Sequence, residues 1–447
     1  MSPAALSVFA MSGNVPAVRF TAGEVARATG GALVGDDVAV EGVSIDSRTI
    51  EARQLFVPII GARDGHEFID PARGPYLTSR SPVGGTAIVV ADTGSALLAL
   101  GRHARSRLVD RVVGITGSVG KTTVKDLTHS ILVARYVTAA SERSFNNELG
   151  VPLTLANARD DAEAIVVEMG ARGPGHIALL CDIARPTVGV VTAVGAVHTE
   201  VFGTVDDVAR GKRELVEALP AIGTAVLNAD DARVAAMRDR TDATVVTFGV
   251  DASADVTAED VRLDDELRSS FTLASPWGSV DVRLGVRGVH QIANALAASA
   301  AALACGVELD HVVAGLADAV LSPWRMEVDR APSGALIIND AYNANPLSVA
   351  AALRSLAVLD ATRRIAFLGT MAELGATAAD AHRDAAALAA SLGIRVVAVA
   401  EPMYGTEVVD SLDAAVALIE LGPGDAVLVK GSRVAGLEVL AAALLTR

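Results

Sequence analysis

The segment GITGSVGKTT, residues 114–123, has the residue types and spacing of a phosphate-binding loop. An apolar run leads into a glycine-rich turn, and the pattern predicts a helix that starts at Lys121. Backbone N–H groups of such a turn, together with the helix N-terminus, hold phosphate oxygens. Lys121 would reach the β- and γ-phosphates of a nucleotide, and Thr122 would coordinate Mg²⁺. The strict pattern GxxxxGK(S/T) has its first glycine where this chain has Ile115. The residues predicted to contact the nucleotide are Gly117, Ser118, Gly120, Lys121, Thr122 and Thr123.

Lysine is rare in this chain, which has four lysines among its 38 Lys and Arg residues. A lysine amine is a compact charge that can react once it has lost its proton, and arginine offers neither property. Arginine flanks Lys212 on both sides in ARGKREL, so charge alone does not explain that lysine. Lys430, in LVKGSR, is a third lysine in a segment typical of chemistry, whereas Lys125 is interpreted as a chance survivor.

Polar residues close several apolar runs. Glu168 ends AIVVEMG, and a carboxylate at the end of a buried strand beside a phosphate loop is where a magnesium ligand belongs. Taken alone, a partly exposed structural glutamate would be the simpler interpretation. His198 follows another apolar run in TAVGAVHTEVFG, and a lone histidine is more often structural than a ligand. Asn228, Asp340 and Lys430 stand at equivalent places.

The elements that must position these residues follow a repeated order of apolar β-rich run, polar turn and helix. The runs include RVVGIT, AIVVEMG, VGVVTAVG and GTAVLNADD, and later ALIINDAYNANP, RIAFLGTMAELG, RVVAVAEP and AVLVKGSR. This alternation predicts an α/β fold with parallel sheets covered by helices on both faces. In such sheets ligands bind at the carboxyl ends of the strands.

The length of 447 residues predicts two or three domains. Residues 1–93 read as short strands and turns with a few helices, and SPWRMEV near residue 322 reads as a connector. We therefore divide the chain into a small α/β domain (1–93), a central parallel-sheet domain with the phosphate loop (94–322) and a Rossmann-like C-terminal domain (323–447).

Composition excludes several classes of protein. A net charge of -15 argues against a nucleic-acid or anionic-membrane surface, although one cleft can still be locally positive. Two cysteines, Cys181 and Cys305, give no disulfide framework, so a reducing cytoplasm fits. The N-terminal stretch lacks the basic region of a signal peptide, and Met11 is an alternative start. The Ala-rich IANALAASAAALACGV suits a buried helix and not a membrane span.

Together these segments resemble the Mur ligases, the ATP-dependent amide-forming enzymes of peptidoglycan precursor synthesis. The resemblance covers nearly the whole chain and is strongest to the MurF type, which adds D-alanyl-D-alanine to UDP-N-acetylmuramoyl-tripeptide. The stretches that carry it are SFNNELGVPLTL (144–155), NDAYNANPLSVAAAL (339–353), GTMAELG (369–375), VKGSR (429–433) and the N-terminal SIDSRTIEARQLFVPIIGARDGHEFIDPA. GTMAELG has Thr370 where the family usually has Asp, although Glu373 matches.

The resemblance implies a role for each matching residue. It assigns Thr122 and Glu168 to one Mg²⁺, and His198 with a carbamylated Lys212 to a second. Lys121 is implied to act on the phosphates during catalysis. The implied nucleotide contacts outside the phosphate loop are Asn294, Arg325, Asp340, Tyr342, Asn343 and Asn345. The implied substrate contacts are Ser47, Arg48, Asp64, Gly65, His66, Asn146, Asn147, Lys430 and Arg433.

The implied reaction activates the tripeptide carboxylate as an acyl phosphate with ATP, and the amine of D-alanyl-D-alanine then attacks it. The alternatives are a sister Mur ligase, a folylpolyglutamate-type ligase, a catalytically reduced ATP-binding subunit and a P-loop switch protein. The segments YNANP and SFNNELG argue against the first two. The retained Lys121, Glu168, His198 and Lys212 argue against the others. We expect a cytoplasmic monomer, and the third residue of the tripeptide, diaminopimelate or lysine, stays open.

Overall fold

The computed structural model describes residues 19–142, 144–195 and 202–446, and the chain divides into two compact units. The first unit comprises residues up to 108 together with 152–161, and the second comprises 109–151 and 162–447. Helix α4 (Gly150–Asn157) begins in the second unit and ends in the first. The predicted division at residues 93 and 322 stays a prediction.

The first unit is built on a five-stranded sheet in the order β2-β7-β6-β5-β4, in which only the β2–β7 pair is antiparallel. Helix α1 begins with a capping box in which Thr21 and Glu24 satisfy each other's backbone N–H groups, and it ends at Gly30 in the left-handed region. The elements are β1 (Phe20–Thr21), α1 (Ala22–Thr29), β2 (Ala32–Val34), β3 (Ala39–Val40), β4 (Gly42–Ser44), β5 (Gln54–Phe56), η2 (Gly65–Phe68), β6 (Tyr76–Thr78), β7 (Ala87–Val89) and α2 (Thr93–Arg105).

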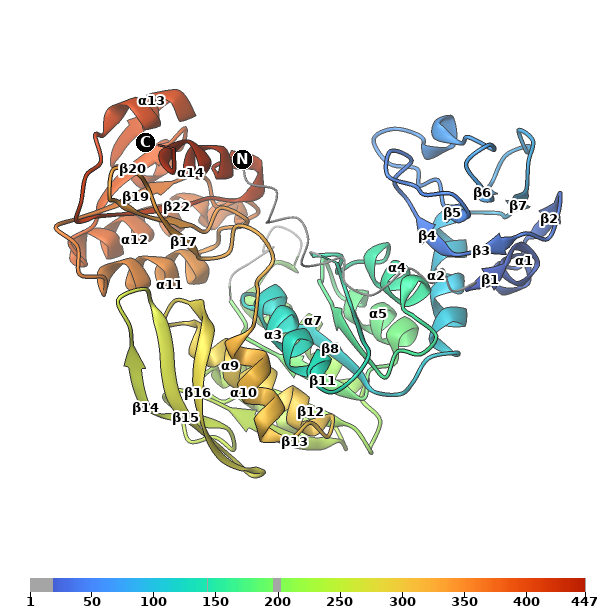
Figure 1. Ribbon diagram of the computed structural model, residues 1–447, viewed down its shortest axis with the longest axis horizontal. Coiled ribbons are helices and arrows are strands. Elements are labelled where there is room, and N and C mark those ends of the chain that lie inside the picture. The colour runs from blue at the N-terminus through green and yellow to red at the C-terminus, as the bar shows by residue number, and fades with distance from the viewer. Residues whose placement is uncertain (1–18, 143, 196–201, 447) are drawn as a thin grey trace. The chain divides into compact units, whose positions relative to one another are not determined.

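The second unit contains a six-stranded, fully parallel sheet in the order β13-β12-β11-β8-β10-β9 (Figure 1). Its central strands are buried along their whole length, which explains their nearly unbroken apolar sequences. The elements are β8 (Val112–Thr116), α3 (Lys121–Val133), β9 (Thr138–Ala140), β10 (Ala164–Glu168), α5 (His176–Ala184), β11 (Val188–Val191), α7 (Val205–Glu217), β12 (Thr224–Asn228), α8 (Ala232–Ala235), η3 (Ala236–Arg240) and β13 (Thr244–Phe248).

A three-stranded antiparallel sheet follows, which the sequence pattern did not predict. It consists of β14 (Thr257–Leu263), β15 (Arg268–Ser275) and β16 (Gly278–Arg287), and it packs beside α9 (Gln291–Ala304) and α10 (Leu309–Ala317), as Figure 1 shows. Alternate residues of β15 and β16 join one apolar core with α3, α9 and the central sheet. Helix α9 is the predicted Ala-rich buried helix.

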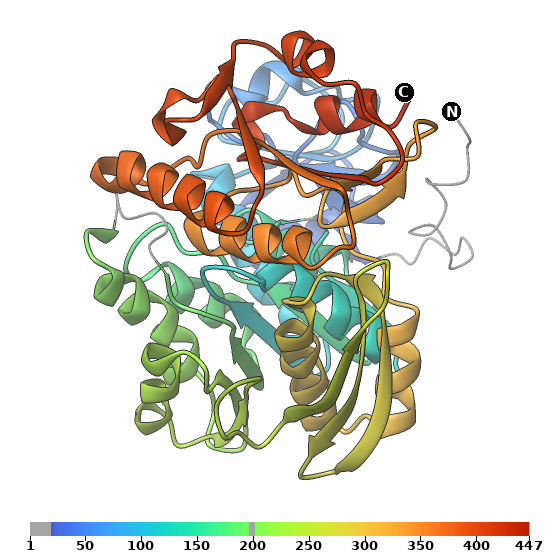
Figure 2. The ribbon, with the colours of Figure 1, turned by 90° about the vertical axis from the view of Figure 1, so that its left-hand side faces the viewer.

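A second six-stranded sheet, in the order β17-β18-β22-β19-β20-β21, closes the unit; only the β17–β18 pair is antiparallel. Alternate residues of its strands enter two separate cores, one under α11 and α12 and the other under α13 and α14 (Figure 2). The elements are β17 (Glu327–Arg330), β18 (Leu336–Asn339), α11 (Pro346–Ala357), β19 (Arg363–Leu368), η4 (Gly375–Thr377), α12 (Ala378–Ser391), β20 (Arg395–Val399), η5 (Pro402–Tyr404), β21 (Glu407–Val409), α13 (Leu412–Leu418), β22 (Asp425–Lys430), η6 (Arg433–Ala435) and α14 (Glu438–Leu444).

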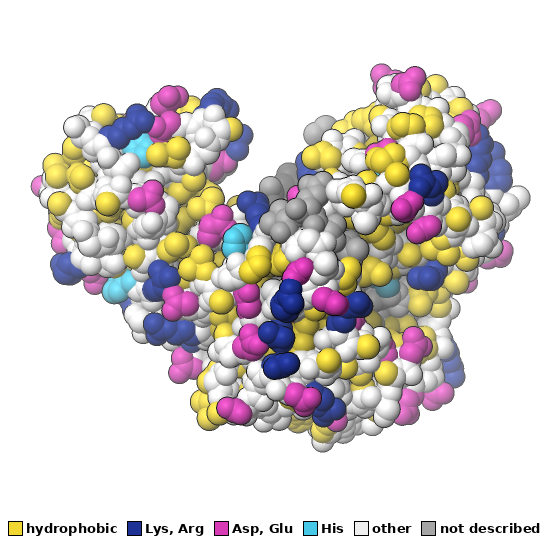
Figure 3. Space-filling model, turned by 180° about the vertical axis from the view of Figure 1, so that it is seen from behind, with side chains coloured by type: hydrophobic (Ala, Val, Ile, Leu, Met, Phe, Trp, Pro, Cys, Tyr) yellow, Lys and Arg dark blue, Asp and Glu magenta, His cyan; other side chains and the backbone are white. Residues whose placement is uncertain are grey.

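The predicted α/β fold with parallel sheets is confirmed, and so is the placement of polar residues at strand ends. Glu168, Asn228 and Lys430 are the last residues of β10, β12 and β22, and Asp340 directly follows β18. Within the described ranges, no helix has both the length and the apolar character needed to cross a membrane. On the face drawn in Figure 3, acidic and basic side chains are interspersed and do not gather into large patches of one sign.

Candidate active site

A cavity of about 430 Å³ lies in the second unit, among the carboxyl ends of the central strands, the residues that follow β18 and the last residue of β22. It brings together residues that are hundreds of positions apart in the sequence. The predicted residues that line it are Ser118, Gly120, Lys121, Thr122, Thr123, Asn146, Asn147, Glu168, Lys212, Asn294, Arg325, Asp340, Tyr342, Asn343, Asn345 and Lys430.

The turn between β8 and α3 has the shape that only glycine allows at two positions. Gly117 has φ +153°, and a Cβ there would lie 1.8 Å from Thr192 Oγ1. Gly120 caps α3 with φ +82°, and a Cβ there would lie 2.5 Å from Asn294 Oδ1. Lys121 Nζ donates to the carbonyl of Gly117 at 2.7 Å and so folds back over its own loop. A short turn whose backbone must be approached closely, followed by a helix N-terminus, is a phosphate site.

Two lysines in this cavity have perturbed amines. Lys212, on α7, is 3% exposed, and burial with the nearby charge of Lys121 holds its pKa well below the ordinary value. Burial also lowers the pKa of Lys121, against the opposing effect of Glu168. Burial in this fold therefore favours the neutral amine of Lys212 over the charged form.

Glu168 presents a carboxylate oxygen with no partner in the described part of the chain. The residue is 1% exposed; Oε1 accepts a hydrogen bond from Asn146 Nδ2 at 2.8 Å, whereas Oε2 is buried and unpaired. A buried carboxylate oxygen without a donor is costly unless a cation meets it. Glu168 and the hydroxyl of Thr122 are oxygen ligands of the kind that Mg²⁺ takes, with its other positions left to water and phosphate. In the described ranges no group of three His, Cys, Asp or Glu side chains forms a ready-made metal site.

Arg325 connects the C-terminal sheet to the phosphate loop. Its Nη2 donates to Thr122 Oγ1 at 2.9 Å, and its guanidinium lies 4.4 Å from the centre of the Tyr342 ring. Its Nε is buried and has no partner among the described residues. The residues on both sides, Trp324 at φ 62° and Met326 at φ 51°, are in the left-handed region, which is uncommon for large side chains. This connector holds the guanidinium of Arg325 against the hydroxyl of Thr122, the proposed metal ligand.

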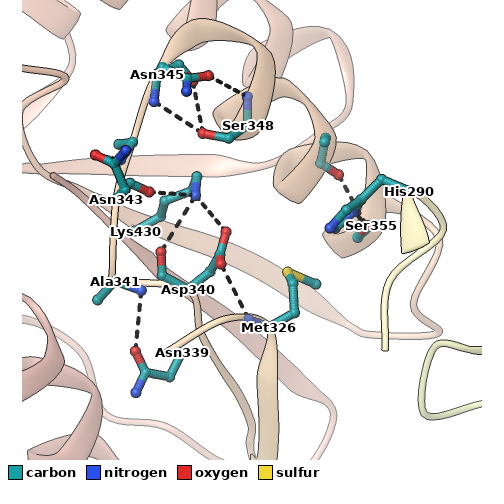
Figure 4. A network of polar contacts seen from close by, with 12 residues as sticks. His290, Met326, Asn339, Asp340, Ala341, Asn343, Asn345, Ser348, Ser355 and Lys430 are labelled. Carbon is teal, nitrogen blue, oxygen red and sulfur yellow. Dashed lines mark hydrogen bonds and ion pairs between the residues drawn. The ribbon is translucent and has the colours of Figure 1, made fainter. Parts of the chain in front are cut away.

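Lys430 organises the segment that follows β18 (Figure 4). Its Nζ is 2.5 Å from Asp340 Oδ2 and donates to the carbonyl of Asn343 at 2.9 Å. Asp340 also accepts the Met326 N–H at 3.2 Å, so the network reaches the connector. Asn345 caps α11 by accepting the Ser348 N–H at 2.9 Å. In this structure the amine of Lys430 is an internal support and not a free cation.

Several residues of the cavity were not predicted. Thr192 closes β11 against the phosphate loop, and Ser144 lies 3.3 Å from the Thr122 hydroxyl. His290 and Gln291 precede Asn294, whose Nδ2 donates to Gln291 Oε1 at 2.8 Å. Burial lowers the pKa of His290 to about 4, so its ring is neutral near pH 7. A strand-to-turn-to-helix pattern recurs in the sequence at the start of α9, and this signal would have predicted His290 and Gln291.

Ser47 and Arg48 are neighbouring predicted substrate residues of the first unit. Ser47 lines a cavity of about 220 Å³ formed with aromatic residues, Arg73 and the Gly74–Pro75 turn. Arg48 is exposed and makes a two-pronged ion pair with Asp46 at 2.9 and 2.7 Å. The guanidinium of Arg48 is thus engaged by Asp46, and Arg48 does not line the cavity that Ser47 lines.

The turn of Asp64, Gly65 and His66 has a more internal role. His66 is buried; its Nδ1 lies 2.8 Å from Asp64 Oδ1 and its Nε2 accepts the Ser79 N–H at 3.1 Å. A Cβ at Gly65 would lie 2.6 Å from the Ile59 nitrogen. Both ring nitrogens of His66 are thus used within the unit, so any part that it plays in binding is through the shape of the turn.

Two further predicted residues are Arg433, which does not line the cavity, and His198. Arg433 lies over the Trp324 ring at 4.5 Å and pairs with Glu438 at 2.5 Å, and it does not line the cavity. His198 falls outside the described residues. Thr370 contributes its carbonyl to the Ser432 N–H at 2.9 Å, a backbone contact that does not depend on Asp at this position.

Comparison with known protein families gives two matches. Residues 115–302 match the Mur ligase middle domain, and residues 324–433 match the Mur ligase glutamate ligase domain. A protein of Mycobacterium tuberculosis named UDP-N-acetylmuramoyl-tripeptide–D-alanyl-D-alanine ligase is 39% identical, across 96% of this chain and 98% of its own length. The protein of the same name from Escherichia coli K12 is 34% identical, across 93% of this chain and 96% of its own length.

Solved structures agree with this grouping. MurF from Acinetobacter baumannii superposes with a TM-score of 0.88 at 30% identity, covering 95% of this chain and 98% of that one. MurF from Thermotoga maritima in complex with ADP superposes with a TM-score of 0.80 at 26% identity, covering 90% and 96%. The chain therefore belongs to the Mur ligase family, and within that family to the MurF type.

Proposed function

We propose that this protein is an ATP-dependent ligase that joins D-alanyl-D-alanine to UDP-N-acetylmuramoyl-tripeptide. One observation carries the proposal: a single cavity is lined by a phosphate loop, an unpaired buried carboxylate and the connector Arg325. The names of the similar proteins supply the substrates, and the ADP complex of the T. maritima relative supports the use of ATP.

The chemistry starts with the tripeptide carboxylate, which is a poor acylating agent. One carboxylate oxygen attacks the γ-phosphorus of ATP, the bond to the β,γ-bridging oxygen breaks, and ADP leaves. The free amine of D-alanyl-D-alanine then attacks the acyl carbon, and the tetrahedral intermediate expels phosphate as the amide forms and the amine loses a proton. Lys121 stabilises the charge that develops between two anions in the first step. The acyl phosphate must be kept from water, which a closed cavity provides.

The donor set at the phosphate loop fits Mg²⁺. Thr122 and Glu168 would hold it, with the unpaired Glu168 Oε2 as the strongest indication. When bound, the ion would supply charge neutralisation to the phosphates. Arg325 now donates to the same Thr122 hydroxyl, and one lone pair of the oxygen is left for the ion when Thr122 donates its O–H to Ser144.

A second Mg²⁺ held by His198 and a carbamylated Lys212 is the finer part of the proposal. Carbamylation requires a neutral amine that attacks CO₂ and releases one proton, and Lys212 is buried with its pKa held well below the ordinary value. The resulting carbamate is a carboxylate-like ligand that arginine cannot form.

The substrate roles are assigned by unit. We assign the UDP-sugar end to the first unit, near the cavity that Ser47 lines, and the peptide end to Asn146 and Asn147 in the second. Lys430 and Arg433 belong to the segment assigned to the incoming dipeptide, and the contacts above give both of them supporting roles. A monomeric, cytoplasmic protein stays our prediction, and the third residue of the tripeptide stays open.

Phosphate release tests the proposal directly. The purified protein is supplied with ATP, Mg²⁺ and UDP-muramoyl-tripeptide in diaminopimelate and lysine forms, with and without D-alanyl-D-alanine. We expect release that requires both substrates and a pentapeptide product by mass. Release that depends on another amine would move the protein to a sister specificity, and no release with any amine would contradict the proposal.

A further inference from the structure

Lys125 and Asp126 form a buried ion pair on the helix that follows the phosphate loop. Their exposed fractions are 3% and 6%, and Lys125 Nζ lies 2.7 Å from Asp126 Oδ1. Neither residue lines the cavity. Burying two charges is costly, and an apolar pair of similar volume often serves stability equally well. Stability alone therefore does not explain why these two charges are buried.

Lys125 reaches the proposed metal ligand through one intermediate residue. Its Nζ donates to the carbonyl of Ser141 at 2.9 Å, in the segment that follows β9. The Ser141 hydroxyl in turn accepts the backbone N–H of Glu168 at 3.3 Å. Five residues further on, Asn146 holds Glu168 Oε1. Lys125 thus fixes the segment that sets both the backbone and one oxygen of Glu168.

Asp126 reaches the connector on the opposite side. Its Oδ2 accepts the N–H of Ser322 at 2.7 Å, and Ser322 is 5% exposed. Three residues later Arg325 donates to Thr122, which lies one helical turn before Asp126 on the same face of α3. The helix therefore holds the connector at two points. The Asp126 contact is buried, and the Thr122 contact is in the cavity where a ligand can compete for it.

We infer that Lys125 and Asp126 are a positioning pair that couples the two sides of the nucleotide site. Lys125 sets Glu168 through Ser141, and Asp126 sets Arg325 through Ser322. The ion pair links the Lys125–Ser141 contact to the Asp126–Ser322 contact, so a displacement at one contact is transmitted to the other. This inference rests on the proposed function, because it takes Glu168 as the metal ligand, and it predicts that the pair controls how strongly Mg²⁺ and nucleotide support each other.

The test separates positioning from stability with the double variant Lys125→Met/Asp126→Leu, which removes both charges and leaves neither one stranded. Thr128→Val is the matched control, because its buried hydroxyl on the same helix has no partner among the described residues. ADP affinity is measured by calorimetry with and without Mg²⁺, and the thermal midpoint is recorded. The double variant should lower the thermal midpoint modestly, because the buried Ser322 N–H and Ser141 carbonyl lose their partners. It should also lose about tenfold of the Mg²⁺-dependent gain in ADP affinity, the size expected for a partner behind a metal ligand. Thr128→Val should leave the Mg²⁺-dependent gain unchanged, and its thermal midpoint should be equal to or higher than that of the wild type, because it removes a buried hydroxyl that has no partner among the described residues.

A second readout follows the connector. The chain has two tryptophans, so Trp277→Phe leaves Trp324 as the only tryptophan, and its emission is excited selectively over that of the four tyrosines. Addition of Mg²⁺ and ADP should change its fluorescence, and the double variant should reduce that change. If the double variant does not fold, Ser141→Ala tests the path from Lys125 to Glu168, because it keeps the Lys125 contact with the Ser141 carbonyl and deletes the hydroxyl that accepts the Glu168 N–H.

The outcomes are distinct. A folded double variant, or Ser141→Ala in its place, with an unchanged Mg²⁺-dependent gain overturns the inference and leaves the proposed function standing. A wild-type protein whose ADP binding is indifferent to Mg²⁺ overturns the inference as well, and the phosphate-release assay then decides the proposed function independently. A loss of stability with full Mg²⁺ coupling assigns the pair a purely structural role, which also overturns the inference.

Discussion

Replacing Gly117 with alanine tests the shape of the phosphate loop. The added Cβ would lie 1.8 Å from Thr192 Oγ1, whereas ordinary contact begins at 3.4 Å, so the two groups have to move apart by 1.6 Å, the difference between these distances. Thr192 is 6% exposed, and its hydroxyl donates to the Val119 carbonyl at 2.5 Å, so the threonine is held in place. The loop must therefore move, and a displacement of about 1 Å at such a site costs on the order of 100-fold. We expect Gly117→Ala to weaken ADP binding and ATP turnover by about that factor.

A second substitution should restore part of the loss. Without the Thr192 hydroxyl, the atoms nearest to the new Cβ are Thr192 Cβ at 3.1 Å and the Ala193 nitrogen at 3.2 Å, which a small adjustment can accommodate. Gly117→Ala/Thr192→Ala should therefore bind ADP at least about tenfold better than Gly117→Ala, a coupling of about 1.4 kcal/mol. Recovery should be incomplete, because alanine at φ +153° keeps a backbone cost on the order of 1 kcal/mol.

Calorimetric titration with ADP and Mg²⁺ on the wild type, both single variants and the double variant measures this cycle, and thermal unfolding by circular dichroism confirms that each is folded. Thr192→Ala is the control for the lost hydroxyl. Gly117→Ala binding within threefold of the wild type would show that the loop does not enclose the phosphates. A folded double variant that binds no better than Gly117→Ala would show that contact with Thr192 is not the cause.

Four further predictions concern three residues of the site. Lys212→Arg should abolish turnover although it keeps the charge, and Lys212→Ala should regain activity with short carboxylic acids; near-normal turnover of the arginine variant would remove the carbamate. Because the folded-state pKa of Lys212 is depressed, protonation of this amine favours the unfolded chain. The stability of the protein is therefore highest above the unfolded pKa near 10.4 and is lost as the pH falls. Lys212→Met should accordingly raise the thermal midpoint near pH 7 in CO₂-free buffer, and an unchanged or lower midpoint would contradict the depressed pKa. Glu168→Gln should raise the Mg²⁺ concentration needed for half-maximal turnover by about tenfold or more, with ADP affinity in the absence of Mg²⁺ unchanged; an unaltered Mg²⁺ requirement would exclude Glu168 as a ligand. The pKa of His290 is lowered to about 4 in the folded protein and is about 6.5 in the unfolded chain. Lowering the pH from 7 to 4 should therefore reduce the free energy of unfolding of the wild type by about 3 kcal/mol through this residue. Urea titrations of His290→Gln should not show this part of the loss.

Much of the site could be predicted because its residues stand at the ends of strands whose sequences are apolar throughout. Glu168 and Lys430 each follow an unbroken buried strand, and parallel strands bring their carboxyl ends to one edge of a sheet. The phosphate loop is a local motif in which strand, glycine turn and helix are contiguous. Such signals need no knowledge of contacts between distant segments.

The remainder depends on long-range contacts. Lys125 looked dispensable because its partners are Ser141, beyond the end of its helix, and an adjacent Asp126 whose own partner, Ser322, is 196 residues away. The antiparallel sheet β14–β16 was not predicted, because its strands carry Asp and Arg on the exposed side and do not repeat the strand–turn–helix order. His66 matched a family segment, yet only its contacts with Asp64 and Ser79 show that its ring is used inside the unit.

The distribution of lysine has a practical consequence for chemical labelling. Lys125, Lys212 and Lys430 are each 2–3% exposed, and Lys121 lines the nucleotide cavity, so no lysine side chain stands open on the surface. Amine-directed reagents therefore meet no surface lysine that would consume them before they reach the cavity. Those that enter find Lys121, Lys212 and Lys430, and the lowered pKa values of the first two favour the reactive neutral amine. Lysine modification by an acylating probe, read at the individual lysines by peptide mapping, would thus report nucleotide occupancy, because a bound nucleotide would shield the lysines of the cavity.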